Sequence, residues 1–223
     1  MEITVNGVTL HYEKTGEGRP LFLLHGNGED HTIFDQAAKV LRSHFAVYMP
    51  DTRGHGKSAY EGELHYADFA ADLNAMIEAL QLEDVAVYGF SDGGITALLA
   101  AMDSSRITSV ITSGANTRPE TVKQPLRTLI ALSGTFAHDP KMRLMQKEPD
   151  ITADMLKKIQ AETLVLAGAH DLVEESDTRF IASCIPHASL RILQSESHGS
   201  YIVHDRRIGD LLVAYLNHAR KGE

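Results

Sequence analysis

The chain has 223 residues, of which 43% are hydrophobic, and its formal net charge is −9 at pH 7. This length allows one domain with a sizeable core, and an acidic chain without a Lys/Arg cluster lacks the electrostatic basis of nucleic-acid binding. Its apolar runs are far shorter than a membrane-spanning helix requires. The one cysteine, Cys184, fits a reducing compartment. The N-terminus begins on a strand-like pattern rather than a signal peptide, so we expect a cytoplasmic protein with no nucleic-acid or membrane partner.

The first half of the chain alternates between strand and helix patterns. Residues alternate in polarity from Val8 to Glu13 beyond an Asn6-Gly7 turn, which predicts an opening hairpin. Short continuous apolar runs predict strands at 20–24, 45–49, 85–89 and 107–111. Apolar residues at helical spacing predict helices over 33–41 and 69–80.

The same alternation resumes near residue 163. Strands are predicted at 163–168 and 190–193, with helices around Phe180 and over 208–216. Continuously apolar strands that alternate with helices indicate a mostly parallel sheet covered on both faces. We therefore expect a single α/β doubly wound domain over residues 1–223.

Residues 117–160 interrupt this rhythm. They contain four prolines and no convincing strand, and Thr152 is expected to cap a short helix whose Leu156 packs against Ile151. We interpret the segment as a small helical cap over the carboxyl edge of the sheet, where open α/β sheets bind ligands. The alternative is an ordinary connection that contributes only to packing.

Gly89-Phe90-Ser91-Asp92-Gly93 matches the nucleophile-elbow pattern G-x-S-x-G. A serine held on a strained strand-to-helix turn exposes its Oγ, and only glycine at positions 89 and 93 leaves room for the crowded backbone. The pattern is common by chance, but a strand precedes it here and a helix follows it. Ser91 is therefore the candidate nucleophile.

An elbow serine needs a histidine to accept its proton and a carboxylate to orient that histidine. In this architecture the carboxylate and histidine follow the serine in the chain, at the ends of later strands. Asp171 follows the strand at 163–168 and His198 follows the last strand. We assign Asp171 as the orienting acid and His198 as the general base.

Other residues are weaker candidates for these roles. His170 is expected on a solvent-facing loop, and His204 on the final helix in a surface or capping role. The strand at 107–111 leads into Ser113-Gly114-Ala115-Asn116, which lacks the carboxylate that an alternative acid would require. Asp51 is interpreted as structural, in a loop-fixing pair with Arg53.

The negative charge that develops on a substrate oxygen needs preorganised donors. The backbone N–H of Asp92, at the start of the elbow helix, is the natural first donor. The second is expected from His25-Gly26-Asn27-Gly28, with the N–H of Asn27 in place. The N–H groups of Gly28 and Glu29 are the alternatives.

The sequence contains no motif for metal-binding or nucleotide-binding chemistry. The chain has no H-E-x-x-H, C-x-x-C or calcium-loop motif, so no metal site is expected, and the high count of twelve histidines is attributed to scattered surface residues besides His198. Neither G-x-G-x-x-G nor a P-loop occurs, and we expect no cofactor.

Taken together, these motifs resemble those of the α/β-hydrolase superfamily. The resemblance rests on His25-Gly26-Asn27-Gly28, the loop Asp51–Ser58, the elbow, Gly168-x-x-Asp171 and Ser197-His198-Gly199, which occur in the family order. It implies an eight-stranded, mostly parallel sheet with an antiparallel N-terminal strand and a cap after the sixth strand. The cap is short for the family, which implies a shallow pocket, and the proline that many members carry near His25-Gly26 is absent. Members that open epoxides or remove halides use aspartate at the elbow, so Ser91 disfavours those reactions.

The predicted function is a serine hydrolase that cleaves a small carboxylic ester, lactone or related acyl substrate through an acyl-enzyme. A carbon–carbon bond hydrolase of the same fold is the first alternative, and a non-catalytic protein that binds a small ligand is the second. Fold alone does not choose among these. The sequence carries no pattern that specifies the acyl group, the leaving group or the oligomeric state.

Overall fold

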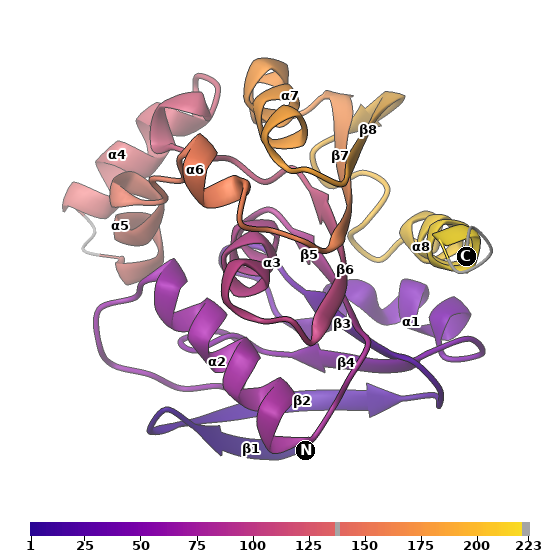
Figure 1. Cartoon of the computed structure of the whole chain (residues 1–223). Helices are drawn as coiled ribbons and strands as arrows, with labels where there is room; N and C mark the ends of the chain where they lie inside the picture. The colour runs from indigo at the N-terminus through magenta and orange to yellow at the C-terminus, as the bar shows by residue number, and fades with distance from the viewer. Residues whose placement is uncertain (137–138, 220–223) are drawn as a thin grey trace.

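The computed structural model describes residues 1–136 and 139–219, and these residues fold around one sheet (Figure 1). Within them the sheet has eight strands in the order β1-β2-β4-β3-β5-β6-β7-β8. The strands are β1 (Glu2–Val5), β2 (Val8–Thr15), β3 (Pro20–Leu24), β4 (Ala46–Pro50), β5 (Val85–Phe90), β6 (Ile107–Ser113), β7 (Glu162–His170) and β8 (Ala188–Ser197). Only β2 runs against both of its neighbours, and β3 to β8 pair in parallel. This confirms the predicted doubly wound sheet with its antiparallel N-terminal strand.

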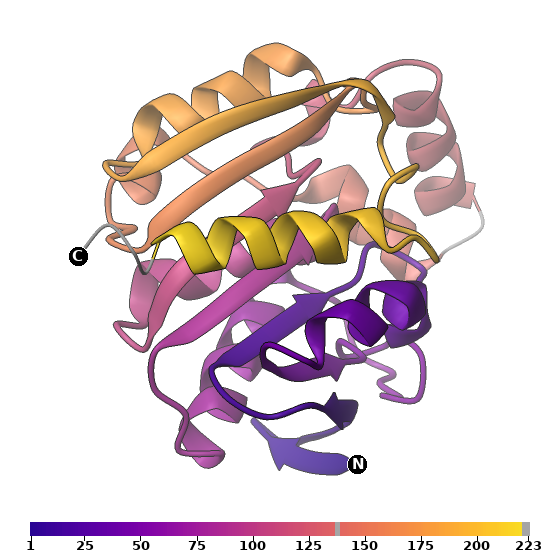
Figure 2. The same ribbon diagram turned by 90° about the vertical axis from the view of Figure 1, so that its right-hand side faces the viewer.

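Helices cover both faces of the sheet (Figure 2). One face carries α1 (Asp35–Leu41), which follows the short helix η1 (His31–Phe34), and α8 (Arg207–Ala219). The other carries α2 (Tyr66–Ala79), α3 (Asp92–Asp103), α6 (Ala153–Leu156) and α7 (Glu175–Cys184). Each face has its own apolar core, because strands such as β5 send alternate side chains to opposite sides. Burial on both faces explains the continuously apolar strand sequences.

The segment between β6 and β7 is helical, as predicted. It contains η2 (Pro119–Thr121), α4 (Leu126–Phe136), α5 (Pro140–Lys147) and α6. Thr152 caps α6 by accepting a hydrogen bond from the Met155 N–H, which confirms the predicted N-cap. Ile151 and Leu156 are buried in the core beside α3 and α7. Among the described residues, α5 adds only Leu144 to that core and α4 adds none, and the two helices pack against each other beside it (Figure 1). Only α4 and α5 are therefore in a position to act as a cap.

The predicted pair between Asp51 and Arg53 is wrong. Both oxygens of Asp51 accept backbone hydrogen bonds, from the N–H groups of His31 and Lys57 at 2.9 Å. Arg53 turns the other way and donates twice to Asp72, at 2.7 Å each. Asp51 is structural, but its partners are two backbone N–H groups and the His31 ring, which no sequence spacing reveals.

His204 was also expected on the last helix, whereas it lies in the turn before α8 begins at Arg207. Its Nδ1 lies 3.0 Å from Asp35, and both side chains are exposed.

No helix of the described residues is long and apolar enough to cross a membrane.

Candidate active site

Ser91 lies on a sharp turn between β5 and α3. Its backbone has φ 53° and ψ −116°, a conformation that costs energy for any residue with a side chain. The turn is tight because the backbones nearly touch: a Cβ on Gly89 would lie 2.1 Å from the Gly93 oxygen, and one on Gly93 would lie 2.2 Å from the Leu24 oxygen. Glycine is therefore required at both positions, for the reason given by the sequence pattern.

The structure brings Ser91, His198 and Asp171 into one hydrogen-bonded chain. The Oγ of Ser91 lies 3.1 Å from Nε2 of His198, and Nδ1 of the same ring lies 2.6 Å from Oδ1 of Asp171. The serine precedes α3, the acid follows β7, and the histidine follows β8. Parallel strands end at the same edge of the sheet, so three residues far apart in the chain meet there.

Asp171 is held as a carboxylate. Burial opposes its ionisation, but the hydrogen bond and charge of His198, with the backbone N–H groups of Val173 and Gly168, outweigh burial and lower its pKa. These N–H groups lie 3.0 Å and 3.4 Å from the two carboxylate oxygens. An ionised Asp171 accepts from Nδ1–H of His198, which leaves Nε2 free to take a proton from Ser91.

The loop after β3 passes directly beside the nucleophile. A Cβ on Gly26 would lie 3.2 Å from the Cβ of Ser91. Within the described residues the N–H of Asn27 has no hydrogen-bond partner, whereas the N–H of Glu29 donates to the Gly26 oxygen. Asp92 opens α3, so its N–H has no partner within the helix. Two free donors thus lie near Ser91, as an oxyanion site requires.

A family model described as the alpha/beta hydrolase fold matches residues 19–141, which is more than half of the chain. The chain belongs to the α/β-hydrolase family.

Individual relatives agree with this placement. Serine hydrolase BPHL from Homo sapiens is 30% identical, over 90% of this α/β-hydrolase and 80% of the relative. An enol-lactonase from Burkholderia xenovorans LB400 superposes with a TM-score of 0.81 at 23% identity, covering 97% of this chain and all of the other. An esterase from Thermogutta terrifontis gives a TM-score of 0.79 at 20% identity, with 98% of each chain covered. At these identities the two solved structures establish the fold alone.

The α/β-hydrolase carries a small pocket above Ser91. Its volume is about 220 Å³. The loop after β3 and the catalytic candidates form its floor, and α4 and α5 contribute apolar walls: the residues from these two helices are Leu126, Leu129, Ile130, Met142 and Met145. Ligand pockets for drug-sized molecules commonly occupy about 300–1,000 Å³. The site is therefore sized for a small, largely apolar group.

Glu29 is a polar group in this pocket, and the sequence indicated a role only for its backbone N–H. Its side chain accepts a hydrogen bond from the Gly26 N–H at 2.9 Å. Burial raises the pKa of Glu29 above its ordinary value. The contact holds the loop in the bend that carries Asn27 past Ser91.

His25 supports the same loop from behind. It is buried, and its Nε2 accepts from the Thr52 N–H at 3.1 Å, so its Nδ1–H donates to the Gly26 oxygen at 2.8 Å. Burial lowers the pKa of His25, which keeps the ring neutral as this pattern demands. The His25-Gly26 motif was the only sequence signal for this role, and it did not indicate the partner Thr52.

The rejected histidine His170 remains outside the site. It ends β7 with an exposed side chain, although it precedes Asp171 in the chain. Among the described residues, Ser91, His198, Asn27 and Glu29 line the same pocket, and Asp171 lies behind the histidine ring.

Proposed function

We propose that this chain is a serine hydrolase of small carboxylic esters or lactones. The observation that carries the proposal is the continuous chain from Ser91 Oγ through His198 to Asp171, at 3.1 Å and 2.6 Å. Such a chain activates a hydroxyl for attack on a carbonyl carbon. The name of its human relative, a serine hydrolase, supports the same class of reaction.

In the proposed reaction the Ser91 Oγ forms a bond to the substrate carbonyl carbon while Nε2 of His198 takes the hydroxyl proton. The carbonyl electron pair moves to oxygen, and the N–H groups of Asn27 and Asp92 stabilise the resulting negative charge by donating hydrogen bonds to that oxygen. The electron pair on the oxyanion then re-forms the carbonyl double bond, and the bond between the carbonyl carbon and the leaving oxygen breaks. His198 gives its proton to the leaving oxygen. Water repeats these steps on the acyl-enzyme, which releases the acid and restores Ser91.

The pocket supports a short acyl chain. A volume of about 220 Å³ is below that of sites for drug-sized molecules, and Leu126, Met142 and Met145 offer no polar partner beyond weak thioether acceptors. A lactone presents the same carbonyl in a ring, so it is included in the proposed class.

The deciding experiment combines active-site labelling with turnover. A fluorophosphonate probe should label the wild-type protein and the Ser183→Ala variant, which alters an exposed serine on α7, but not the Ser91→Ala variant. Turnover of p-nitrophenyl esters should fall as the acyl chain grows, and small lactones should be hydrolysed. Labelling that persists in Ser91→Ala would contradict the nucleophile assignment.

The Asp171→Asn variant tests the orienting acid. It should fold as the wild type does and lose about four orders of magnitude in kcat, because an amide leaves the imidazole in the wrong tautomer. The wild-type protein also decides between the alternatives. If it turns over only substrates with a scissile carbon–carbon bond, the carbon–carbon hydrolase is favoured. If it binds a small ligand without turnover, the ligand-binding alternative is favoured.

A further inference from the structure

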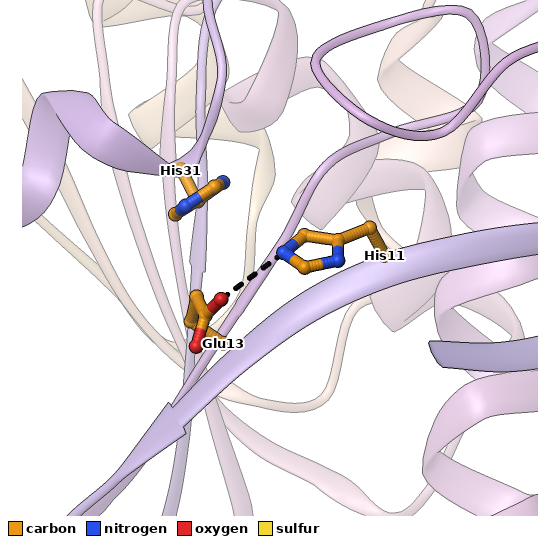
Figure 3. A group of neighbouring side chains, drawn as sticks. All are labelled: His11, Glu13 and His31. Carbon is orange, nitrogen blue, oxygen red and sulfur yellow. Dashed lines mark hydrogen bonds and ion pairs between the residues drawn. The ribbon is translucent and has the colours of Figure 1, made fainter. Parts of the chain in front are cut away.

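Three side chains converge beside β2, and none of them lines the pocket described above. His11 and Glu13 are two residues apart on this strand, so they project from the same side, and His31 opens η1 beside them (Figure 3). One ligand atom from each lies within 4.8 Å of the others. Nε2 of His11 is 3.1 Å from Oε1 of Glu13, and the two imidazole centroids are 5.4 Å apart.

The pairing of β2 with β4 brings His31 to this place. Tyr12 pairs with Pro50, so the next residue, Asp51, donates its N–H to the His11 oxygen at 2.9 Å. The carboxylate of Asp51 then holds His31 twice, through its backbone N–H at 2.9 Å and its Nδ1 at 2.7 Å. Asp51 thus fixes a histidine from η1 beside a strand that precedes it by about twenty residues.

The contact with Asp51 also orients the His31 ring for ligation. A carboxylate that accepts from one ring nitrogen leaves the other nitrogen with a lone pair, which is the usual arrangement around histidines that bind metal ions. Nδ1 of His31 faces Asp51, so Nε2 is the ligating nitrogen.

His31 belongs to a second group as well, with Asp30 and Asp51. Three of the four carboxylate oxygens of that group are already in use: Asp30 Oδ1 accepts from both the N–H and the hydroxyl of Thr32, and the two oxygens of Asp51 accept from His31 and Lys57. Among the described residues, the Glu13 side chain bonds only to His11. The available ligands therefore lie on the β2 side of His31.

We propose that His11, Glu13 and His31 form a binding site for a divalent transition-metal ion, with Zn²⁺ as the best match. Two imidazoles and one carboxylate are a common Zn²⁺ ligand set, completed by water. The histidine side chains are 11% and 13% exposed and that of Glu13 is 45% exposed, so an ion enters from the Glu13 side. None of the three lines the pocket above Ser91, so the ion clamps β2 to η1 and takes no part in hydrolysis.

Isothermal titration with Zn²⁺, on the chelator-treated full chain, tests this site without using its hydrolase activity. The wild type should bind one equivalent saturably. Glu13→Gln keeps the shape of a half-exposed side chain but supplies a poor ligand, and it should weaken binding about tenfold or more, as should His11→Gln. Zn²⁺ should also raise the unfolding temperature of the wild type but not that of Glu13→Gln.

Two matched controls separate this site from other histidines. His204→Gln removes a histidine that is paired with Asp35 away from the proposed site, and Asp30→Asn alters the competing group while keeping a helix-capping residue. Both should bind Zn²⁺ as the wild type does. No saturable binding, equal affinity in Glu13→Gln and the wild type, or a loss of affinity in Asp30→Asn would each overturn the proposal.

Discussion

The side-chain amide of Asn27 donates a hydrogen bond to the carboxylate of Asp92 at 2.9 Å. The same nitrogen donates to the carbonyl of Lys141 at 3.2 Å. One asparagine therefore joins three segments: the loop after β3, the first turn of α3 and the first turn of α5. Tyr66 also donates to Asp92, which is buried behind Ser91. The position of the Asn27 N–H depends on this set of contacts.

The Asn27→Ala variant tests this dependence. It keeps the backbone N–H but loses the tie to Asp92, so the proposed oxyanion donor is no longer held in place. We expect kcat for a short p-nitrophenyl ester to fall about tenfold or more, because small displacements of a positioned group are costly. Asn74→Ala is the matched control, since Asn74 donates to the Ala100 oxygen outside the site. Equal losses in the two variants would contradict the positioning role.

Asp92 should make the stability of the protein depend on pH. Burial raises its pKa to about 6 from 3.8, although the hydrogen bonds from Asn27 and Tyr66 oppose the rise. A carboxyl group whose pKa is higher in the folded state stabilises the fold when protonated, and this contribution is lost as the pH rises through about 6. The asparagine side chain of the Asp92→Asn variant does not titrate, so the variant lacks this pH-dependent contribution.

The measurement is the free energy of urea unfolding for both proteins across a pH series. The stability of Asp92→Asn relative to the wild type should increase by about 2–3 kcal/mol between about pH 4 and about pH 7. A difference that stays constant with pH would show that the Asp92 pKa is ordinary.

Leu129 on α4 should set the acyl-chain preference. It lines the pocket although its side chain is 58% exposed, so truncation removes a wall without emptying the core. Leu129→Ala should raise KM several-fold for a hexanoyl ester and leave KM for an acetyl ester unchanged, because each buried methylene contributes about 0.8 kcal/mol. Leu132→Ala, which alters a similarly exposed leucine on the same helix outside the pocket, should leave both values unchanged. A shift in the Leu132 variant would point to a general effect on α4.

The ion pair between Arg53 and Asp72 should matter for stability. Both carboxylate oxygens are bonded by the guanidinium at 2.7 Å, and the side chains are only 7% and 4% exposed. Asp72→Ala leaves a buried cation without its main partner, so it should lower the free energy of unfolding by about 3–5 kcal/mol. Asp154→Ala, in an exposed pair with Lys157, should leave the urea midpoint unchanged. A small effect of Asp72→Ala would mean that Asp68, 3.6 Å from Arg53, replaces it.

Periodicity was sufficient to predict the layers of this fold. Strands buried on both faces, such as β5, cannot alternate in polarity, and their unbroken apolar runs are visible in the sequence. Chain order then placed Ser91, Asp171 and His198 at strand ends on one edge of the sheet. Their meeting in the structure follows from parallel pairing, which is why the sequence could name all three before any contact was known.

The sequence did not predict the hydrogen-bond partners of the side chains. Asp51 and Arg53 are near neighbours in the chain, yet one binds backbone groups and the other binds Asp72. The prediction of a pair failed because residues two apart on a loop need not face each other, and each group found a better-placed partner elsewhere.

The sequence by itself determined the sheet, the family motifs and the candidate nucleophile, because these depend on local periodicity and on glycines that a tight turn requires. Only the tertiary structure decided what joins the segments: the contact of Asn27 with Asp92, and the gathering of His11 and Glu13 around His31. Both depend on strand register and loop path, which arise from packing across the whole chain. No local pattern encodes such distances, since the residues concerned lie up to 65 positions apart.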